Sequence, residues 1–335
     1  MAWVKSLALG AGLCISAFLG FGEVFAAPMN EGSALSYEKR GKQFQSQGTR
    51  CFGWLWLPGE HTGPPPVVIM AHGYGAQMDF GLPAFAERFV NAGLAVFMFD
   101  YRNFGESEGE PRNLVSPKRH LQDWEAALAF VKGLKEVDPS RIALWGSSFA
   151  GGHVIVTAAK HPEIKVVVAQ VPFVDGLSTA RKMGLGYVFK GTGYFILDAL
   201  RAITFTKPYY VPLVNDPGKF GIMNTPDSKP GYLAIVPKNT SWKNEAPARC
   251  LVPTVFYRPI AKAKKVKSPT LLIAAEKDSL IDLKAVKKTA KRMPNTKLIE
   301  VPCGHFDVYS GEMFEKVVKA EAEFLNQHLQ QKEKS

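Results

Sequence analysis

Short runs of consecutive apolar residues recur along this chain, and a stretch with helical spacing follows most of them. Six of these runs are typical of strands that are buried on both faces, and they lie at 67–72, 94–100, 141–145, 164–173, 269–275 and 297–302. Helical patterns are found at 85–93, 120–134, 151–161, 281–292 and from about residue 311. Because apolar strands that alternate with helices must be covered on both sides, the pattern predicts an α/β fold around a mostly parallel sheet.

Two stretches near the start of the chain differ, because polar and apolar residues alternate in them. They lie between Glu38 and Pro58 and read KQFQSQ and RCFGWLWL. Alternation of this kind predicts a β-hairpin at the edge of the sheet. Together with the six apolar runs, the hairpin predicts a central sheet of about eight strands with helices on both faces.

One long segment interrupts the alternation of strands and helices. It runs from Asp175 to Lys265, is rich in proline and aromatic residues, and is too long for a simple crossover. We therefore interpret 176–265 as a cap inserted over the carboxyl ends of the strands, between a first core part at 27–175 and a second at 266–335. Four aromatic residues of this segment suit either an apolar substrate site or the cap's own core: Tyr187, Phe189, Tyr194 and Phe195.

Residues 1–26 have the composition of a secretory signal peptide. Lys5 is followed by an apolar stretch with no charge until Glu23, and small residues precede a cleavage point after Ala26. The sequence thus predicts export, to the periplasm or out of the cell. An uncleaved N-terminal membrane anchor is the alternative, because about 17 apolar residues is near the lower limit for a bilayer span.

Composition and charge add limits on what the chain can be. A chain of 335 residues with 46% hydrophobic content buries a sizeable core without a disulfide framework. Removal of the signal peptide would leave Cys51, Cys250 and Cys303, which allow one bridge at most. The net charge is +11, and twelve basic residues lie between Arg258 and Lys297. This strip suits an anionic membrane or an acidic substrate, but lysines on solvated helices explain it as well, and without interleaved aromatic residues it does not indicate nucleic-acid binding.

The stretch RIALWGSSFAGGHV at 141–154 contains a candidate nucleophile. A serine at a sharp turn from a strand into a helix needs small residues two positions before and two positions after it. Ser147 would have tryptophan and phenylalanine at these positions, whereas Ser148 has glycine and alanine. The pattern therefore favours Ser148, and a purely structural turn is the alternative.

A serine hydroxyl becomes nucleophilic when a histidine takes its proton and a carboxylate orients that histidine. On a strand–turn–helix scaffold the chain order is serine, acid, histidine. His305 fits the base because it follows the last predicted strand, whereas His328 lies in a polar terminal helix. Asp278 fits the acid because it follows the strand before that. Asp175 is the alternative acid, and Asp282 is expected to begin a helix.

Acyl transfer also requires N–H groups that bind the carbonyl oxygen as its negative charge develops. One N–H is expected from Phe149, the residue after the nucleophile, and the other from Tyr74 in the loop AHGYGAQ. The side chain of Tyr74 is expected to form a pocket wall, and His72 is expected to brace the loop. We expect His153 to be a buried polar residue bonded to backbone, with a place in the pocket lining as the alternative, and we expect Cys303 to be structural.

These motifs resemble those of the α/β-hydrolase superfamily, over nearly the whole mature chain. The resemblance is carried by the stretches HGYG, DYRNFGESEGEPR, GSSFAGG, AEKD and GH, at 72–75, 100–112, 146–152, 275–278 and 304–305. Within the superfamily the sequence is most similar to bacterial serine hydrolases of the dienelactone-hydrolase and serine-aminopeptidase-like groups. The resemblance implies the α/β-hydrolase fold and an esterase, thioesterase or peptidase activity.

Together the residues and the resemblance predict a serine hydrolase that cleaves a small-molecule ester or thioester through an acyl-enzyme. Such a reaction requires no metal and no organic cofactor. A serine peptidase of the aminopeptidase or dipeptidyl-peptidase type is the nearest alternative, with a short peptide as its substrate. A non-catalytic binding protein of the same fold is the alternative from another class. Membrane contact is expected only through the signal segment or the basic strip.

Overall fold

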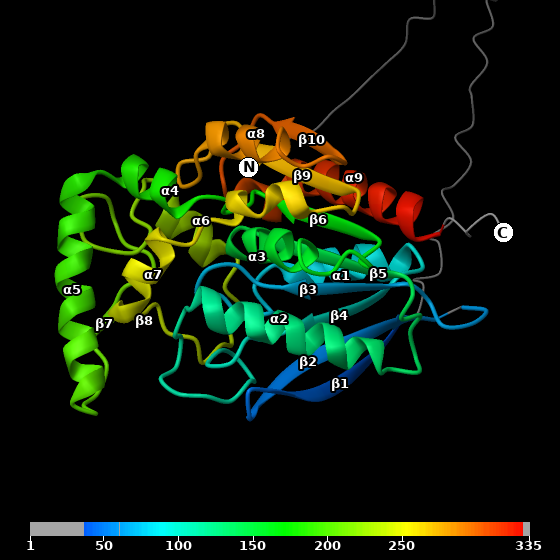
Figure 1. Ribbon diagram of the computed structural model, residues 1–335, viewed down its shortest axis with the longest axis horizontal. Coiled ribbons are helices and arrows are strands. Elements are labelled where there is room, and N and C mark those ends of the chain that lie inside the picture. Colours follow the sequence, from blue (N-terminus) through cyan, green and yellow to red (C-terminus); the bar gives the residue numbers. More distant parts are fainter. Residues whose placement is uncertain (1–36, 60, 331–335) are drawn as a thin grey trace, which may run out of the picture. The chain divides into compact units, whose positions relative to one another are not determined.

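The structure is a computed structural model that describes residues 37–59 and 61–330. It is built around an eight-stranded sheet (Figure 1). The strand order is β1-β2-β4-β3-β5-β6-β9-β10. Strand β2 runs antiparallel to both of its neighbours, and the remaining neighbours are parallel. The strands span Tyr37–Ser46 (β1), Thr49–Pro58 (β2), Val67–Ala71 (β3), Ala95–Phe99 (β4), Ile142–Ser147 (β5), Val166–Gln170 (β6), Thr270–Ala275 (β9) and Thr296–Val301 (β10). The predicted sheet, including its edge hairpin, is confirmed.

Five helices cover the two faces of the sheet. They span Leu82–Asn91 (α1), Pro117–Lys132 (α2), Phe149–Ala158 (α3), Leu283–Ala290 (α8) and Gly311–Leu329 (α9). Buried side chains of α2, α3 and α8 form one apolar cluster with the sheet, and those of α1 and α9 form a second. Strand β3 contributes side chains to both clusters, because Ile69 belongs to the first while Val68 and Met70 belong to the second. Its uninterrupted apolar run follows from this double burial.

Two helices start at different residues than the apolar spacing predicts, because polar caps and prolines set their ends. Helix α2 begins at Pro117, three residues earlier than predicted, since the side chain of Ser116 accepts a hydrogen bond from Arg119 N. Helix α8 begins at Leu283, where the carboxylate of Asp282 accepts from Lys284 N. The prediction that Asp282 begins a helix is confirmed.

The segment predicted as a cap folds into helices and short strands. Figure 1 shows its longest helix, α5, at the outer edge, beyond the ends of the strands. Several of its buried residues, such as Ala246 and Cys250, join the same apolar cluster as Ile69. The segment contains α4 (Gly176–Met183), α5 (Leu185–Ile203), β7 (Tyr210–Val211), α6 (Ser228–Ala234), β8 (Ala246–Pro247), η1 (Ala248–Cys250), α7 (Leu251–Val255), η2 (Pro259–Ala261) and η3 (Ala263–Lys265). The domain boundaries stay predictions.

The predictions for the N-terminus and the cysteines have different outcomes. The predicted signal peptide lies outside the described residues and stays a prediction.

Cys51, Cys250 and Cys303 are all buried free thiols, so the single bridge that their number would allow is not formed. Burial raises the pKa of the Cys303 thiol to about 11. Within the part of the chain that the structure describes, no helix is long and apolar enough to span a bilayer.

Candidate active site

Ser148 occupies the turn between β5 and α3 in a strained backbone conformation, with φ 56° and ψ −115°. A residue other than glycine adopts such angles only where its surroundings hold it. Both backbone groups of Ser148 are held by the end of β6 and the chain just after it. Its N–H donates to the carbonyl of Gln170, and its own carbonyl accepts from Phe173 N, each at 2.8 Å.

Close packing explains why the residues around Ser148 are small. A Cβ at position 146 would lie 2.4 Å from the carbonyl oxygen of Ala150. A Cβ at Gly152 would lie 2.3 Å from the carbonyl oxygen of Phe173. Helix α3 therefore lies directly against β5 and the chain after β6, and this contact sets the angle of the turn.

The Gly146→Ala substitution is expected to destabilise the fold by about 1–3 kcal/mol, because the new methyl group must displace α3. Hydrolysis should fall with it, since the turn that presents Ser148 shifts. The matched control is Ala150→Gly, which removes a methyl group at the other flank and costs about 1 kcal/mol of helix propensity. Thermal unfolding measures the stability of both variants. A Gly146→Ala protein that is as stable as the parent would contradict this packing.

Hydrogen bonds bring Ser148, His305 and Asp278 together. His305 Nε2 lies 3.0 Å from Ser148 Oγ, and His305 Nδ1 lies 2.7 Å from Asp278 Oδ2. Asp278 follows β9 and His305 follows β10, so loops at the carboxyl ends of adjacent parallel strands deliver both side chains. With Nδ1–H donating to the carboxylate, Nε2 is left as the acceptor for the serine hydroxyl.

The carboxylate of Asp278 is fixed from its other side. Its Oδ1 accepts from the backbone N–H of Leu280 at 2.8 Å and of Ile281 at 2.7 Å, which leaves Oδ2 for the imidazole. Asp175, the alternative acid, lies elsewhere. It caps α4 and pairs with Arg258 at 2.9 Å.

The two residues that were predicted to donate N–H groups, Tyr74 and Phe149, line the same cavity as Ser148. A Cβ at Gly73 would lie 3.2 Å from Ser148 Cβ, so the backbone that leads into Tyr74 passes directly beside the serine. The N–H of Phe149 is the first of α3 and has no acceptor within its helix. The expected brace is present, because His72 Nδ1 donates to the carbonyl of Gly73 at 3.0 Å.

Two cap residues hold the same loop from outside, and sequence reasoning missed both. The hydroxyl of Tyr232 donates to the carbonyl of Tyr74 at 3.0 Å, and Trp242 Nε1 donates to the carbonyl of Gly75 at 2.9 Å. No local motif signals these contacts, because the partners are more than 150 positions apart in the chain. The cap therefore helps to position the loop that carries the N–H of Tyr74.

A buried polar network lies behind this loop. Burial lowers the pKa of His72 to about 3 and that of His153 to about 3, so both imidazoles are neutral at physiological pH. Burial raises the pKa of Asp100 to about 7, although its carboxylate accepts from the N–H of Met78. The partners of His153 are side chains, Tyr257 and His120, and the predicted backbone partner is therefore wrong.

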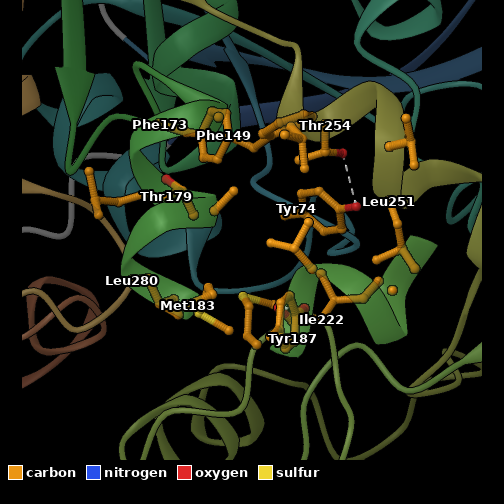
Figure 2. Close-up of a pocket in the computed structure, with 18 of the residues that line it drawn as sticks. Tyr74, Phe149, Phe173, Thr179, Met183, Tyr187, Ile222, Leu251, Thr254 and Leu280 are labelled. Atoms are coloured by element: carbon orange, nitrogen blue, oxygen red, sulfur yellow. Dashed lines mark hydrogen bonds between the residues drawn. The ribbon is translucent and has the colours of Figure 1, made fainter. Parts of the chain in front are cut away.

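An apolar cavity of about 110 Å³ lies beside Ser148 (Figure 2). Phe149 and Phe173 contribute to its wall from the core, and Met183, Tyr187 and Leu251 contribute from the cap. Figure 2 shows Tyr74 in the wall with its hydroxyl turned to Thr254, 3.2 Å away. The side chain of Tyr74 is thus part of the pocket wall, as predicted.

The aromatic residues of the cap divide between the two roles that the sequence left open. Tyr187 lines the cavity. Tyr194 stacks on Tyr209, with ring centroids 5.5 Å apart, and belongs to the cap's own core. Phe189 does neither, because it is 77% exposed.

A second hollow, of about 20 Å³, also borders the serine. Ser148, His305 and Phe306 line it together with Gly73. Its volume has room for a water molecule, which requires roughly 10–15 Å³. Ser148 therefore borders two spaces, the larger apolar cavity and the small hollow, and His305 borders the small hollow.

Comparison with known proteins decides the family. Residues 67–320 match the model of the alpha/beta hydrolase family. The chain is an alpha/beta hydrolase. Within the described part of this hydrolase, no group of three or more His, Cys, Asp and Glu side chains is arranged to hold a metal ion.

Relatives of this hydrolase include proteins from bacteria and fungi. The quorum-quenching protein AidA of Acinetobacter baumannii is 38% identical over 283 residues, which cover 84% of this chain and 93% of AidA. The thiohydrolase aneE of Aspergillus aculeatus is 26% identical over 84% of this chain and 91% of its own. The solved structure of DcsB with its substrate analogue has a TM-score of 0.76 at 24% identity, covers 88% of this hydrolase and 100% of DcsB, and shows the same fold.

Proposed function

We propose that this hydrolase cleaves carboxylic ester or thioester bonds through an acyl-enzyme formed on Ser148. The observation that carries the proposal is the hydrogen-bonded chain from Ser148 Oγ through the imidazole of His305 to Asp278 Oδ2, beside an apolar cavity. A serine, a histidine in one defined tautomer and an orienting carboxylate are the parts that nucleophilic acyl transfer requires.

The first half-reaction acylates the serine. Ser148 Oγ attacks the carbonyl carbon of the substrate while His305 Nε2 takes the hydroxyl proton, and Asp278 stabilises the imidazolium that results. The N–H groups of Tyr74 and Phe149 donate to the carbonyl oxygen as it becomes negative, and each such donor contributes about 3 kcal/mol. The tetrahedral species then expels the alcohol or thiol, which receives the proton from His305.

The second half-reaction returns the free enzyme. A water molecule loses a proton to His305 Nε2 and attacks the acyl carbon, and the acid leaves as Ser148 regains its proton. The small hollow lined by Ser148 and His305 suits this step, because its volume has room for a water molecule.

The substrate class follows from the larger cavity. Its wall is made largely of apolar side chains, so it suits the acyl part of the substrate, and each buried methylene contributes about 0.8 kcal/mol. The printed names of the relatives fit this chemistry, since one is a quorum-quenching protein and another a thiohydrolase. The signal-peptide pattern at 1–26 supports export as part of the proposal.

A panel of chromogenic substrates tests the function. Aryl esters and matching thioesters with acyl chains of increasing length are compared with the amides of the same acids. We expect kcat/KM to rise about fourfold per added methylene until the cavity is filled, and the amides to be hydrolysed far more slowly than the esters. Amides cleaved as fast as the esters would contradict the proposal in favour of a peptidase.

A further inference from the structure

Helix α5 carries an apolar face that points into solvent. Leu185 is 78% exposed, Phe189 77% and Ile203 73%, and their spacing places them on one side of the helix. Figure 1 shows α5 at the outer edge, with no other labelled element on its far side. Further exposed apolar residues extend this face along the helix and just past its end: Ile196, Leu197, Leu200 and Phe205.

This arrangement differs from that of an ordinary cap helix, because the side that faces solvent is apolar. A surface helix of a globular protein turns its apolar stripe toward the core. In α5 the side toward the protein carries Asp198, which is fully buried and pairs with Arg249 at 2.8 Å, while the solvent side is apolar. A helix of this length measures about 30 Å, so the apolar face is long enough to act as a docking surface.

The charges around this face have one sign. Lys190 and Arg201 flank it on the same side, and Arg181 and Lys207 lie beyond its two ends. Asp198 is the one acidic residue between 176 and 209, and Arg249 neutralises it. The exposed charge that borders the apolar face is therefore basic.

Apolar residues bordered by basic ones match the interface of an anionic membrane. Such a helix lies in the plane of the lipid headgroups with its apolar side chains in the acyl region, and its lysines and arginines attract anionic lipids. A second copy of the chain is a poorer partner. Antiparallel twofold pairing of α5 with itself would place the flank that carries Lys190 and Arg201 against the same basic flank.

We propose that α5 docks this protein on anionic membrane surfaces through its exposed apolar face. The opposite side of the same helix contributes Tyr187, Val188 and Gly191 to the cavity beside Ser148, so one helix forms both the docking surface and a wall of the cavity. The proposal concerns binding and is tested without substrate, so it stands or fails separately from the proposed hydrolysis.

A fluorescent probe on the helix tests the contact at its site. Gly193 lies within the apolar face, and a side chain added there meets no atom within 4 Å. In a Cys14→Ala background, Gly193→Cys provides a thiol for an environment-sensitive dye, while Cys51, Cys250 and Cys303 are buried. The matched control is Gln327→Cys, at an exposed position on α9.

The dye at 193 is expected to shift its emission to shorter wavelength when vesicles with phosphatidylserine are added, and to be quenched by lipids with brominated acyl chains. The dye at 327 should show neither change. No change at 193 would overturn the proposal. So would a blue shift that grows with protein concentration in the absence of lipid, which would indicate a second copy of the chain as the partner.

Charge variants test which basic surface faces the lipid. Lys190→Gln combined with Arg201→Gln is expected to raise the lipid concentration for half-maximal dye response by tenfold or more, in line with roughly fivefold per basic residue. The matched control neutralises two exposed lysines of the basic strip, Lys288 in α8 and Lys291 just after it, as Lys288→Gln with Lys291→Gln. It should change the half-maximal lipid concentration by less than about threefold. An equal or larger effect of the control pair would overturn the proposal and assign the contact to the basic strip.

Discussion

Replacing Ser148 with alanine is expected to lower kcat for an aryl ester by about 10⁵-fold or more, with residual turnover from the N–H donors and the binding cavity alone. The reason is that the acyl-enzyme cannot form without Oγ, although the donors and the cavity remain. Steady-state kinetics on purified protein measure the loss. KM should change little, because the apolar side chains that form most of the cavity wall remain.

The adjacent serine provides the control for this result. Ser147 Oγ accepts from Gln170 Nε2 at 2.9 Å and pairs with the hydroxyl of Tyr309, so it acts within the core and not at the cavity. Ser147→Ala should retain kcat within roughly tenfold while losing about 1–3 kcal/mol of stability, because it leaves a buried hydrogen-bond partner unpaired. A Ser148→Ala protein that is as active as Ser147→Ala would show that the nucleophile lies elsewhere.

The Asp278→Asn substitution is expected to lower kcat by about 10³- to 10⁴-fold. The amide keeps the shape of the carboxylate, but it no longer stabilises the imidazolium and it favours the wrong tautomer of His305. Oδ1 would still accept from Leu280 N and Ile281 N, so the loop should keep its conformation. Steady-state kinetics together with thermal unfolding separate the loss of rate from any loss of stability.

The alternative acid serves as the matched control. Asp175 caps α4 and pairs with Arg258, so Asp175→Asn keeps an oxygen that can cap the helix but removes the ion pair. It should cost at most about 1 kcal/mol of stability and leave kcat within roughly tenfold. A larger loss of kcat in Asp175→Asn than in Asp278→Asn would reverse the assignment of the acid.

The fold was predictable because the apolar pattern of each core strand matches the way in which that strand is buried in the sheet. Strands such as β3 are apolar throughout since successive residues enter different clusters, and this is the sequence signal of a sheet covered on both faces. The arrangement of the candidate site was predictable for a related reason. Only a small residue fits at Gly146, and the carboxyl ends of parallel strands bring Asp278 and His305 to one edge of the sheet.

The contacts of the cap were not predictable from the sequence. Tyr232 and Trp242 hold the loop of Tyr74 through long-range hydrogen bonds that no spacing rule encodes. The sequence also does not predict which side of α5 faces solvent, because its apolar residues suit a buried face as well as an exposed one. The hydrogen-bond partner of His153 was likewise not predictable from the sequence. Its burial follows from the apolar run around it, whereas its partner Tyr257 is more than 100 positions away.

The covalent intermediate gives the most direct test of the central claim. The protein is mixed with excess aryl ester, quenched in acid during turnover, digested and analysed by mass spectrometry. Our account predicts the mass of the acyl group on the peptide that contains Ser148, and on no other peptide, with the adduct absent from Ser148→Ala. Steady turnover with no acyl adduct on Ser148, or with the adduct on another residue, would contradict it.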